Sequence, residues 1–220
     1  MRSSIFLITI LLACFYSCST DEDSQNMEST EQEMQEVVVD RTAIPDPVFE
    51  AYLVSINADD VVDGSVITEQ LLLVDQIVVD DLGIEDLTGI ENCPNLYNLW
   101  LQNNNVSSLN VSQNTKLQFL YADGNNLTSI DVSNLAVLEK LSLRNNNLST
   151  INITNNPVIE LLEVSDNEIN AISVVDNPSL FRLDVTNNPL SCIEASEEQI
   201  NNQNLNWTLD ADDTVSLDCN

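Results

Sequence analysis

The acidic stretch NADDVVDGS at residues 57–65 is the best candidate for a metal site in the sequence. Its carboxylates stand next to a glycine, at Asp59, Asp60, Asp63 and Gly64. Carboxylate oxygens are ligands that calcium prefers, but a twelve-residue calcium loop also needs an oxygen donor at its third position and a glutamate at its twelfth. Val61 and Gln70 occupy those two positions. The stretch is therefore interpreted as an acidic turn, and no metal or other cofactor is expected.

Catalytic side chains are scarce elsewhere in the chain. Its 220 residues include no histidine, which removes the commonest general base and metal ligand. There are only four glycines and no glycine-rich phosphate loop, no nucleophile–base pair is visible, and no cysteines have zinc-site spacing. The protein is not expected to be an enzyme.

The net charge excludes further classes of partner. The chain carries 36 acidic and 6 basic residues, a formal net charge of −30. Binding to nucleic acid depends on cations that neutralise phosphates, and this chain has almost none to spare. Attraction to an anionic membrane surface is excluded for the same reason. We expect a monomer that binds no nucleic acid.

The N-terminal residues have the pattern of an export signal. Arg2 precedes the apolar run IFLITILLACFYS, which is shorter than the roughly 20 residues that span a membrane. The run contains or leads into two cysteines, Cys14 in LLAC and Cys18 in FYSC. Both stretches resemble the lipobox of bacterial lipoproteins, whose cysteine becomes the acylated first residue of the mature chain.

The two cysteines are not equivalent. LLAC is closer to the common lipobox, whereas FYSCSTDED is similar to lipoproteins of Bacteroidota, in which acids after the cysteine direct export to the cell surface. This resemblance implies a signal peptide over 1–17 and lipidation of Cys18, with Cys14 as the alternative. It also implies an outer-membrane, cell-surface location in which the lipid is the only attachment to the membrane.

Residues 18–43 are acidic, polar and free of glycine, and such a composition cannot bury enough surface to fold. We predict a disordered tether there. A small N-terminal cap is predicted over 44–73. It includes a short amphipathic helix with Asp46 as its N-cap and Pro47 at its first position.

A 21-residue repeat governs residues 74–190. Apolar residues recur at repeat positions 1, 4, 6, 11, 14 and 16. Position 9 is asparagine at Asn104, Asn125, Asn146, Asn167 and Asn188. One such coil cannot bury its apolar residues alone, but stacked coils share a core. Alternation around positions 4 to 6 predicts one strand per coil and hence a parallel sheet. We predict six coils, the first degenerate and the last truncated.

The pattern L-x-x-L-x-L-x-x-N-x-L is that of leucine-rich repeats. The pieces LNVS, IDVS, INIT and ISVV resemble the compact repeats of Bacteroidota surface proteins, which have short extended segments on the convex side instead of helices. The resemblance implies an α/β-class but β-dominated solenoid with a parallel concave sheet and a small helical cap at its N-terminus. The recurring asparagines are expected to satisfy buried backbone groups of adjacent coils.

Residues 191–220 are interpreted as a C-terminal cap, because the last coil of a solenoid would otherwise expose its core. An exported compartment permits disulfides. We expect a disulfide between Cys192 and Cys219 to close this cap, with Trp207 covering the end. Cys93 would then be an unpaired, buried thiol.

The concave face is defined here by the outward-facing repeat positions 3, 5 and 7 of the predicted sheet. Aromatic and charged candidates for ligand binding gather on it: Trp100, Phe119, Tyr121, Lys140, Arg144, Glu163, Arg182 and Asp184. Exposed aromatics and arginines are the residues that anchor binding interfaces. Alternatively, Asp123 pairs with Arg144 and the aromatic side chains only stabilise the sheet.

These observations predict a cell-surface binding module that recognises a protein or peptide through its concave face. The alternative is a carbohydrate-binding accessory lipoprotein for glycan capture, because aromatic platforms also stack on sugars.

Overall fold

The computed structural model describes residues 39–203 and 205–219. The predicted signal peptide, the lipidation candidates Cys14 and Cys18, and most of the predicted tether lie outside these residues. Within them, every helix is too short or too polar to cross a membrane.

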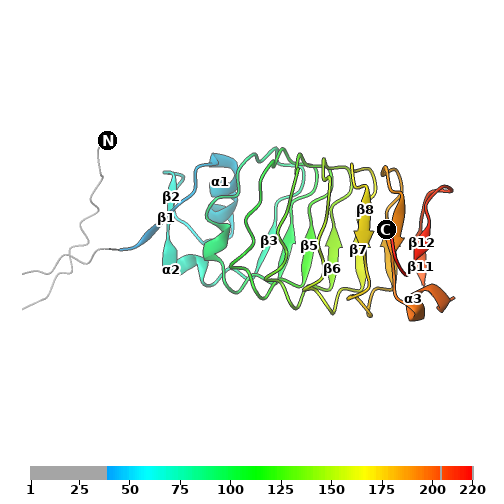
Figure 1. The fold of residues 1–220 in the computed structure, drawn as a ribbon. Helices are drawn as coiled ribbons and strands as arrows, with labels where there is room; N and C mark the ends of the chain where they lie inside the picture. Colours follow the sequence, from blue (N-terminus) through cyan, green and yellow to red (C-terminus); the bar gives the residue numbers. More distant parts are fainter. Residues whose placement is uncertain (1–38, 204, 220) are drawn as a thin grey trace, which may run out of the picture. The chain divides into compact units, whose positions relative to one another are not determined.

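A seven-stranded parallel sheet runs the length of the repeat region (Figure 1). Its order is β11-β9-β7-β6-β5-β4-β3. Its strands are β3 (Gln76–Val78), β4 (Asn98–Trp100), β5 (Phe119–Tyr121), β6 (Lys140–Ser142), β7 (Leu161–Glu163), β9 (Arg182–Asp184) and β11 (Asn206–Thr208). Equivalent residues of successive coils pair in register. The predicted parallel-sheet solenoid is confirmed.

The middle residue of each repeat strand points into the core, which explains the alternating sequence. These side chains are fully buried: Ile77, Leu99, Leu120, Leu141, Leu162 and Leu183. Trp207 pairs in register with Leu183 and packs half-buried against the same core. Trp207, which was predicted to cover the end of the solenoid, therefore lies in a seventh strand of the sheet. A spacing longer than 21 residues separates β9 from β11, which hid this strand from the repeat search.

The opposite side of the solenoid is mostly extended chain. A parallel three-stranded sheet of order β12-β10-β8 forms only near the C-terminus. Its strands are β8 (Ala171–Ser173), β10 (Cys192–Glu194) and β12 (Val215–Ser216). Outside the N-terminal cap, the described helices are the 3-10 turn η1 (Ile90–Asn92) and α3 (Glu197–Asn201). Short extended segments in place of helices are thus confirmed.

The N-terminal cap contains β1 (Arg41–Ala43), α1 (Pro47–Ser55), β2 (Ser65–Ile67) and α2 (Thr68–Leu71), with β1 and β2 antiparallel. Residues 41–43 were expected to belong to the tether, so the start of the ordered region was misplaced. Thr42 is buried and its hydroxyl lies 2.9 Å from that of Thr68. The composition of residues 41–43 could not reveal β1, because this strand is buried only through its pairing with β2.

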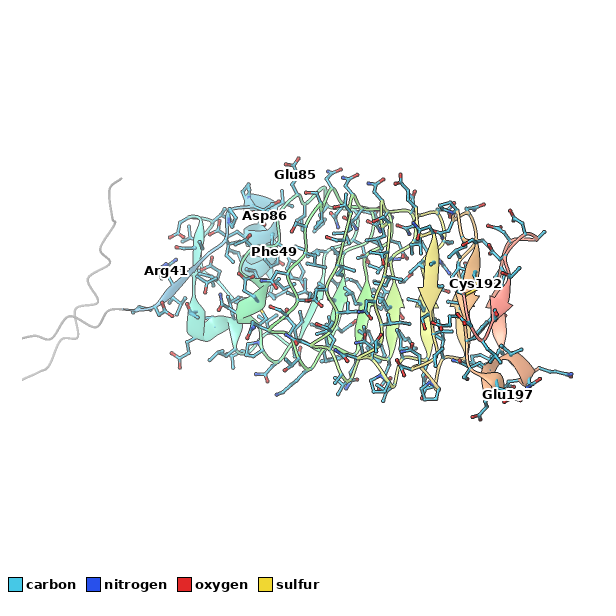
Figure 2. All side chains as sticks on the ribbon, in the orientation of Figure 1. Arg41, Phe49, Glu85, Asp86, Cys192 and Glu197 are labelled. Atoms are coloured by element: carbon cyan, nitrogen blue, oxygen red, sulfur yellow. A yellow bond between two sulfur atoms is a disulfide. The ribbon has the colours of Figure 1, made fainter. Side chains whose placement is uncertain are left out.

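Asp46 joins the cap to the first coil. As expected for an N-cap, its Oδ1 accepts hydrogen bonds from Val48 N and Phe49 N. Its Oδ2 accepts from Glu85 N at 2.8 Å and Asp86 N at 3.1 Å, and these bonds join α1 to the first coil. Figure 2 shows Asp86 beside α1, which carries Phe49. Burial alone would raise the pKa of Asp46, but these four backbone donors outweigh burial and lower it.

The acidic stretch of the cap wraps around a buried carboxylate. Glu50 Oε1 accepts hydrogen bonds from the backbone nitrogens of Asp63, Gly64 and Ser65 at 2.7–2.9 Å. Arg41 forms an ion pair with Asp63 at 3.2 Å. Backbone N–H groups that converge in this way attract an anion. The turn is therefore arranged around an anionic side chain, which is the opposite of what a cation site requires.

The C-terminal end is closed by the predicted disulfide. Cys192 in β10 is bonded to Cys219, with their Cα atoms 5.7 Å apart. Helix α3 begins at a capping box, in which Ser196 and Gln199 exchange hydrogen bonds between side chain and backbone. Cys93 is unpaired and fully buried in the core, as predicted. Burial, with a smaller effect of Glu91, raises the pKa of its thiol to about 12.

Candidate functional site

A ladder of asparagine side chains holds the strands that carry the concave face. In the central coil, Asn146 Nδ2 donates to Ala122 O at 2.9 Å and Leu143 O at 3.1 Å, while its Oδ1 accepts from Leu127 N at 3.0 Å. The same arrangement recurs at Asn104, Asn125, Asn167 and Asn188. Each side chain satisfies backbone groups of its own coil and of the preceding one, so neighbouring strands cannot easily shift.

A second ladder, ten residues further along each coil, was not predicted. In this ladder, each side-chain amide donates a hydrogen bond to a backbone carbonyl of the preceding coil. The donors are Asn114, Asn156, Asn177 and, in α3, Gln199. Cys93 occupies the equivalent position one coil before Asn114, and its carbonyl accepts from Asn114 Nδ2 at 2.9 Å. Asparagine at repeat position 19 was the available signal, but Leu135 interrupts it.

The aromatic candidates come together on strands β4 and β5. Trp100 and Tyr121 pair in register, and their rings make an edge-to-face contact with centroids 5.6 Å apart and planes at 78°. Trp100 is 39% exposed and Tyr121 is half-buried. Phe119 instead contacts Lys140, whose Nζ lies 5.3 Å from the ring centroid. Burial, followed by the nearby carboxylates Glu163 and Asp123, raises the pKa of Tyr121.

Apart from Lys140, the charged candidates form a separate cluster around Glu163, which is only 5% exposed. One carboxylate oxygen of Glu163 lies 2.5 Å from Arg144 Nη2 and 2.7 Å from Arg182 Nη2. Arg144 Nε also lies 3.9 Å from Asp184. Two arginines on one buried carboxylate offset the cost of burying its charge.

The expected alternative pairing of Asp123 with Arg144 is wrong. Asp123 accepts hydrogen bonds from Ser142 Oγ at 2.5 Å, from Gln102 Nε2 at 2.9 Å and from the backbone nitrogen of Arg144 at 2.8 Å. The Arg144 guanidinium turns the other way, toward Glu163 on the next strand, β7. Equivalent repeat positions could not show this, because a long arginine side chain can turn toward a different position on the neighbouring strand of the other side.

The concave face is therefore divided into two chemically different halves. The aromatic half, on β3 to β5, presents Val78, Trp100 and Tyr121 in one row. The charged half, on β6 to β9, has its arginines already bound to Glu163. The aromatic half is better suited to hold apolar groups of a ligand.

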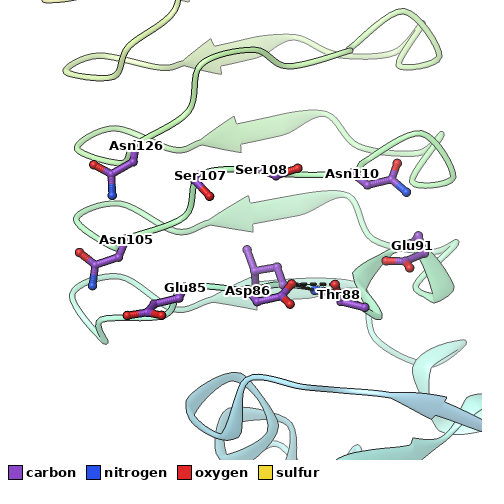
Figure 3. Close-up of a pocket in the computed structure, with 10 residues that line it drawn as sticks. Glu85, Asp86, Thr88, Glu91, Asn105, Ser107, Ser108, Asn110 and Asn126 are labelled. Atoms are coloured by element: carbon purple, nitrogen blue, oxygen red, sulfur yellow. Dashed lines mark hydrogen bonds between the residues drawn. The ribbon is translucent and has the colours of Figure 1, made fainter.

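One surface hollow lies away from the sheet. It is a polar groove of about 880 Å³ between the first two coils (Figure 3). Glu85, Asp86, Thr88 and Glu91 of the first coil face Ser107, Ser108 and Asn110 of the second, with Asn105 and Asn126 at one end. The repeat is irregular here, since Gly89 has a φ of +104° and leads into η1. No motif in the sequence predicted this groove.

The second hollow, about 430 Å³, lies where the N-terminal cap meets the edge strand β3. Tyr52, Ile56, Leu73 and Val78 contribute its larger apolar side chains, and Asp75 contributes a carboxylate. Within the described residues, no cluster of three or more cysteine, aspartate or glutamate side chains is arranged to hold a metal ion.

Comparisons with solved structures agree on the fold. The functional domain of InlJ from Listeria monocytogenes, described as including a cysteine ladder, is 25% identical with a TM-score of 0.67 over 81% of this chain. A leucine-rich-repeat protein of Leptospira interrogans is 27% identical with a TM-score of 0.51 over 58% of this chain. Internalin C2 of Listeria monocytogenes covers 80% of this chain and all of its own at 18% identity and a TM-score of 0.51, which shows the fold alone.

The matched region accounts for only part of the first two proteins, 44% of the InlJ domain and 34% of the Leptospira protein. No protein-family model matches the sequence. A search of curated proteins finds no match either. The repeat geometry and the solved structures together show that the described part of this chain has the fold of a leucine-rich-repeat solenoid.

Proposed function

We propose that this chain is a surface-anchored binding module that recognises a protein or peptide through its concave face. The observation that carries the proposal is the Trp100–Tyr121 pair, two aromatic side chains in contact and partly open to solvent on adjacent strands. The asparagine ladders fix the strands beneath them. Rigid, exposed aromatic residues anchor interfaces because they bury a large area at low entropic cost.

Quantitative capture from candidate partner extracts tests this site. The full chain, the Trp100→Ala/Tyr121→Ala variant and a Phe181→Ala control would each serve as bait. Phe181 is 55% exposed but lies outside the aromatic row, so it controls for the general loss of an exposed aromatic side chain. Proteins that bind this site should be recovered at least about tenfold less with the double variant and equally with the control. Equal recovery with all three baits would contradict the proposal.

Attachment to the outer membrane through Cys18 is the second part of the proposal. Its support is the export-signal pattern at 1–17 and the lipobox resemblance, together with a disulfide that is typical of proteins outside the reducing cytosol. Mass spectrometry of the N-terminal peptide should find acyl chains on Cys18, and Cys18→Ala should remove them. Acylation that survives Cys18→Ala and disappears with Cys14→Ala would assign the anchor to Cys14 instead.

Glycan capture is the alternative function, and the groove between the first two coils is the observation in its favour. Its carboxylates, hydroxyls and amides are groups that hydrogen-bond to sugar hydroxyls. A glycan array probed with the full chain and with Ser108→Trp, which would fill the groove, separates the two functions. Saccharide binding that Ser108→Trp abolishes would favour glycan capture, and an array without signal would favour protein or peptide recognition.

A further inference from the structure

The hollow between the N-terminal cap and β3 continues the aromatic row of the concave face. Val78 lines this hollow and pairs in register with Trp100, which pairs in turn with Tyr121. With strands about 4.8 Å apart, Val78 and Tyr121 are about 10 Å from each other. The next two residues of the same row, Ser142 and Glu163, are buried and polar. The apolar surface therefore runs from Tyr121 into the hollow and ends there.

The lining of the hollow is unusually exposed for apolar side chains. Leu73 is 78% exposed, Val78 42% and Ile56 39%. Leu73 is the most exposed large apolar side chain in the described part of the protein. Contiguous exposed apolar surface with polar surroundings is typical of binding sites.

The edge of β3 beside this hollow is already occupied by a side chain. Tyr52 Oη accepts a hydrogen bond from Val78 N at 3.0 Å. An extended partner strand that paired with this edge would have to displace Tyr52 from that N–H group. A partner is therefore held here through its side chains and not by strand addition.

The charges around the aromatic row favour a partner with positive charge. In the described part of the chain, the ion pairs use the acids Asp63, Glu163 and Asp184. Asp75, which lines the hollow, has no cation in ion-pair range among residues 39–203 and 205–219. The arginines of the concave face are bound to Glu163, and the whole chain carries a net charge of −30. Basic groups of a partner would be attracted and acidic groups repelled.

We infer that the hollow is an anchor pocket for an aliphatic side chain of a basic, apolar peptide segment, whose remaining apolar side chains lie along Val78, Trp100 and Tyr121. This inference rests on the proposed function and names the chemistry of its partner. The recognised segment alternates leucine-like residues with lysine or arginine.

Fluorescence anisotropy with short labelled peptides and the full chain tests the inference. The probe alternates leucine with lysine, and its comparison peptides replace either every leucine with serine or every lysine with glutamate. The leucine–lysine peptide should bind at least about tenfold more tightly than either comparison peptide. If the serine–lysine peptide bound equally tightly, charge alone would explain the binding and the anchor pocket would be rejected. If the leucine–glutamate peptide bound equally tightly, the requirement for a basic partner would be rejected.

Variants locate the binding on the molecule. Leu73→Ser/Val78→Thr should lower the affinity for the leucine–lysine peptide about tenfold and leave the affinity for the serine–lysine peptide unchanged. The control is Leu217→Ser, at a 59% exposed residue of the C-terminal cap, which should change neither affinity. These exposed positions leave the core intact, which an unchanged circular dichroism spectrum and melting temperature would verify.

An affinity that Leu73→Ser/Val78→Thr does not alter would overturn the anchor pocket. The proposed function would still stand in that case if Trp100→Ala/Tyr121→Ala reduced partner capture. Capture that is insensitive to the aromatic variant would instead reject the concave face as the binding site.

Discussion

At the scale of single residues, the asparagines of the repeat explain why short strands of three residues form a stable sheet. Asn146 alone accepts one hydrogen bond and donates to carbonyls of two coils. The Leu127 N–H would otherwise have no partner, and each of the two carbonyls accepts from one further asparagine of the ladder. An unsatisfied buried polar group costs about 1–3 kcal/mol. The recurrence of asparagine every 21 residues made this ladder visible in the sequence.

Replacing Asn146 tests that role. Asn146→Ala should lower the free energy of unfolding by about 3 kcal/mol, because it leaves the buried Leu127 N–H without its partner and removes one of the two amide donors to the Ala122 carbonyl. Its neighbour Asn147 is exposed, so Asn147→Ala should change the free energy by less than about 0.5 kcal/mol. Urea denaturation of the two variants measures the difference. Equal stability of the variants would contradict the structural role of the ladder.

The thiol of Cys93 should be inert in the folded protein. With its pKa raised to about 12 by burial and Glu91, roughly one molecule in ten thousand carries the thiolate at pH 8. Peptide mapping after treatment with iodoacetamide should find Cys93 unmodified in the native chain and modified after denaturation in urea. Rapid modification in the native state would show that the first coil opens readily.

The ion pairs on the concave face could be predicted only in part from the sequence. Their strand positions could be predicted, since each follows from the repeat. Which acid each arginine contacts could not, because Arg144 lies between the coils that carry Asp123 and Glu163, and its guanidinium turns toward Glu163. The consequence is functional: Arg144 and Arg182, which were expected to contact a ligand, are already paired with Glu163 within the face.

At the scale of elements, the regular coils were predictable and the two ends were less so. Each coil repeats the same burial pattern, so period and strand follow from sequence alone. Strands β1 and β11 do not belong to that period. They form because a neighbouring strand offers unpaired backbone groups, which is a tertiary effect that local composition does not report. The hollow beside β3 and the polar groove likewise arise where coils differ in length or meet the cap.

The junction between helix α1 and the first coil should depend on Asp46 and on pH. Asp46→Ala removes four hydrogen bonds to backbone N–H groups and should cost about 2 kcal/mol at pH 7, whereas the exposed Asp60→Ala should cost little. Because the folded-state pKa of Asp46 is lowered, its contribution is present above its ordinary value of 3.8 and is lost as the pH falls through the folded value.

Urea denaturation at pH 7 and pH 3 tests both statements. The gap in free energy between the wild type and Asp46→Ala should narrow at the lower pH. A gap that is as wide or wider at pH 3 would show that the carboxylate charge is not what joins the helix to the coil.

The disulfide should stabilise the C-terminal cap more than the rest of the solenoid. It closes a loop with a sequence separation of 27 residues, for which chain entropy gives about 3.5 kcal/mol. In a repeat protein each coil contacts only its neighbours, so the effect should stay local. Hydrogen exchange of Cys192→Ser/Cys219→Ser should therefore quicken in β10 to β12 and stay unchanged in β4 to β6. Uniform quickening along the chain would indicate that the solenoid unfolds as one unit.

At the scale of the whole molecule, the charge and the concave face point to the same class of partner. A chain with a net charge of −30 keeps acidic partners and anionic surfaces away and attracts basic ones. The aromatic half of the face supplies the apolar area that a specific complex needs. Salt screens the attraction between solvent-exposed charges, so the rate of association with a basic partner should fall as the salt concentration rises. The dissociation rate should depend mainly on Trp100 and Tyr121.

Photo-crosslinking tests most directly whether the concave face is where a partner binds. The photoreactive residue p-benzoylphenylalanine would replace Tyr121 on the sheet or Thr150, which is exposed outside the sheet. Both variants would be irradiated with the same protein recovered by capture. Recognition through the concave face predicts a covalent adduct from position 121 and none from position 150. An adduct from position 150 alone would contradict it.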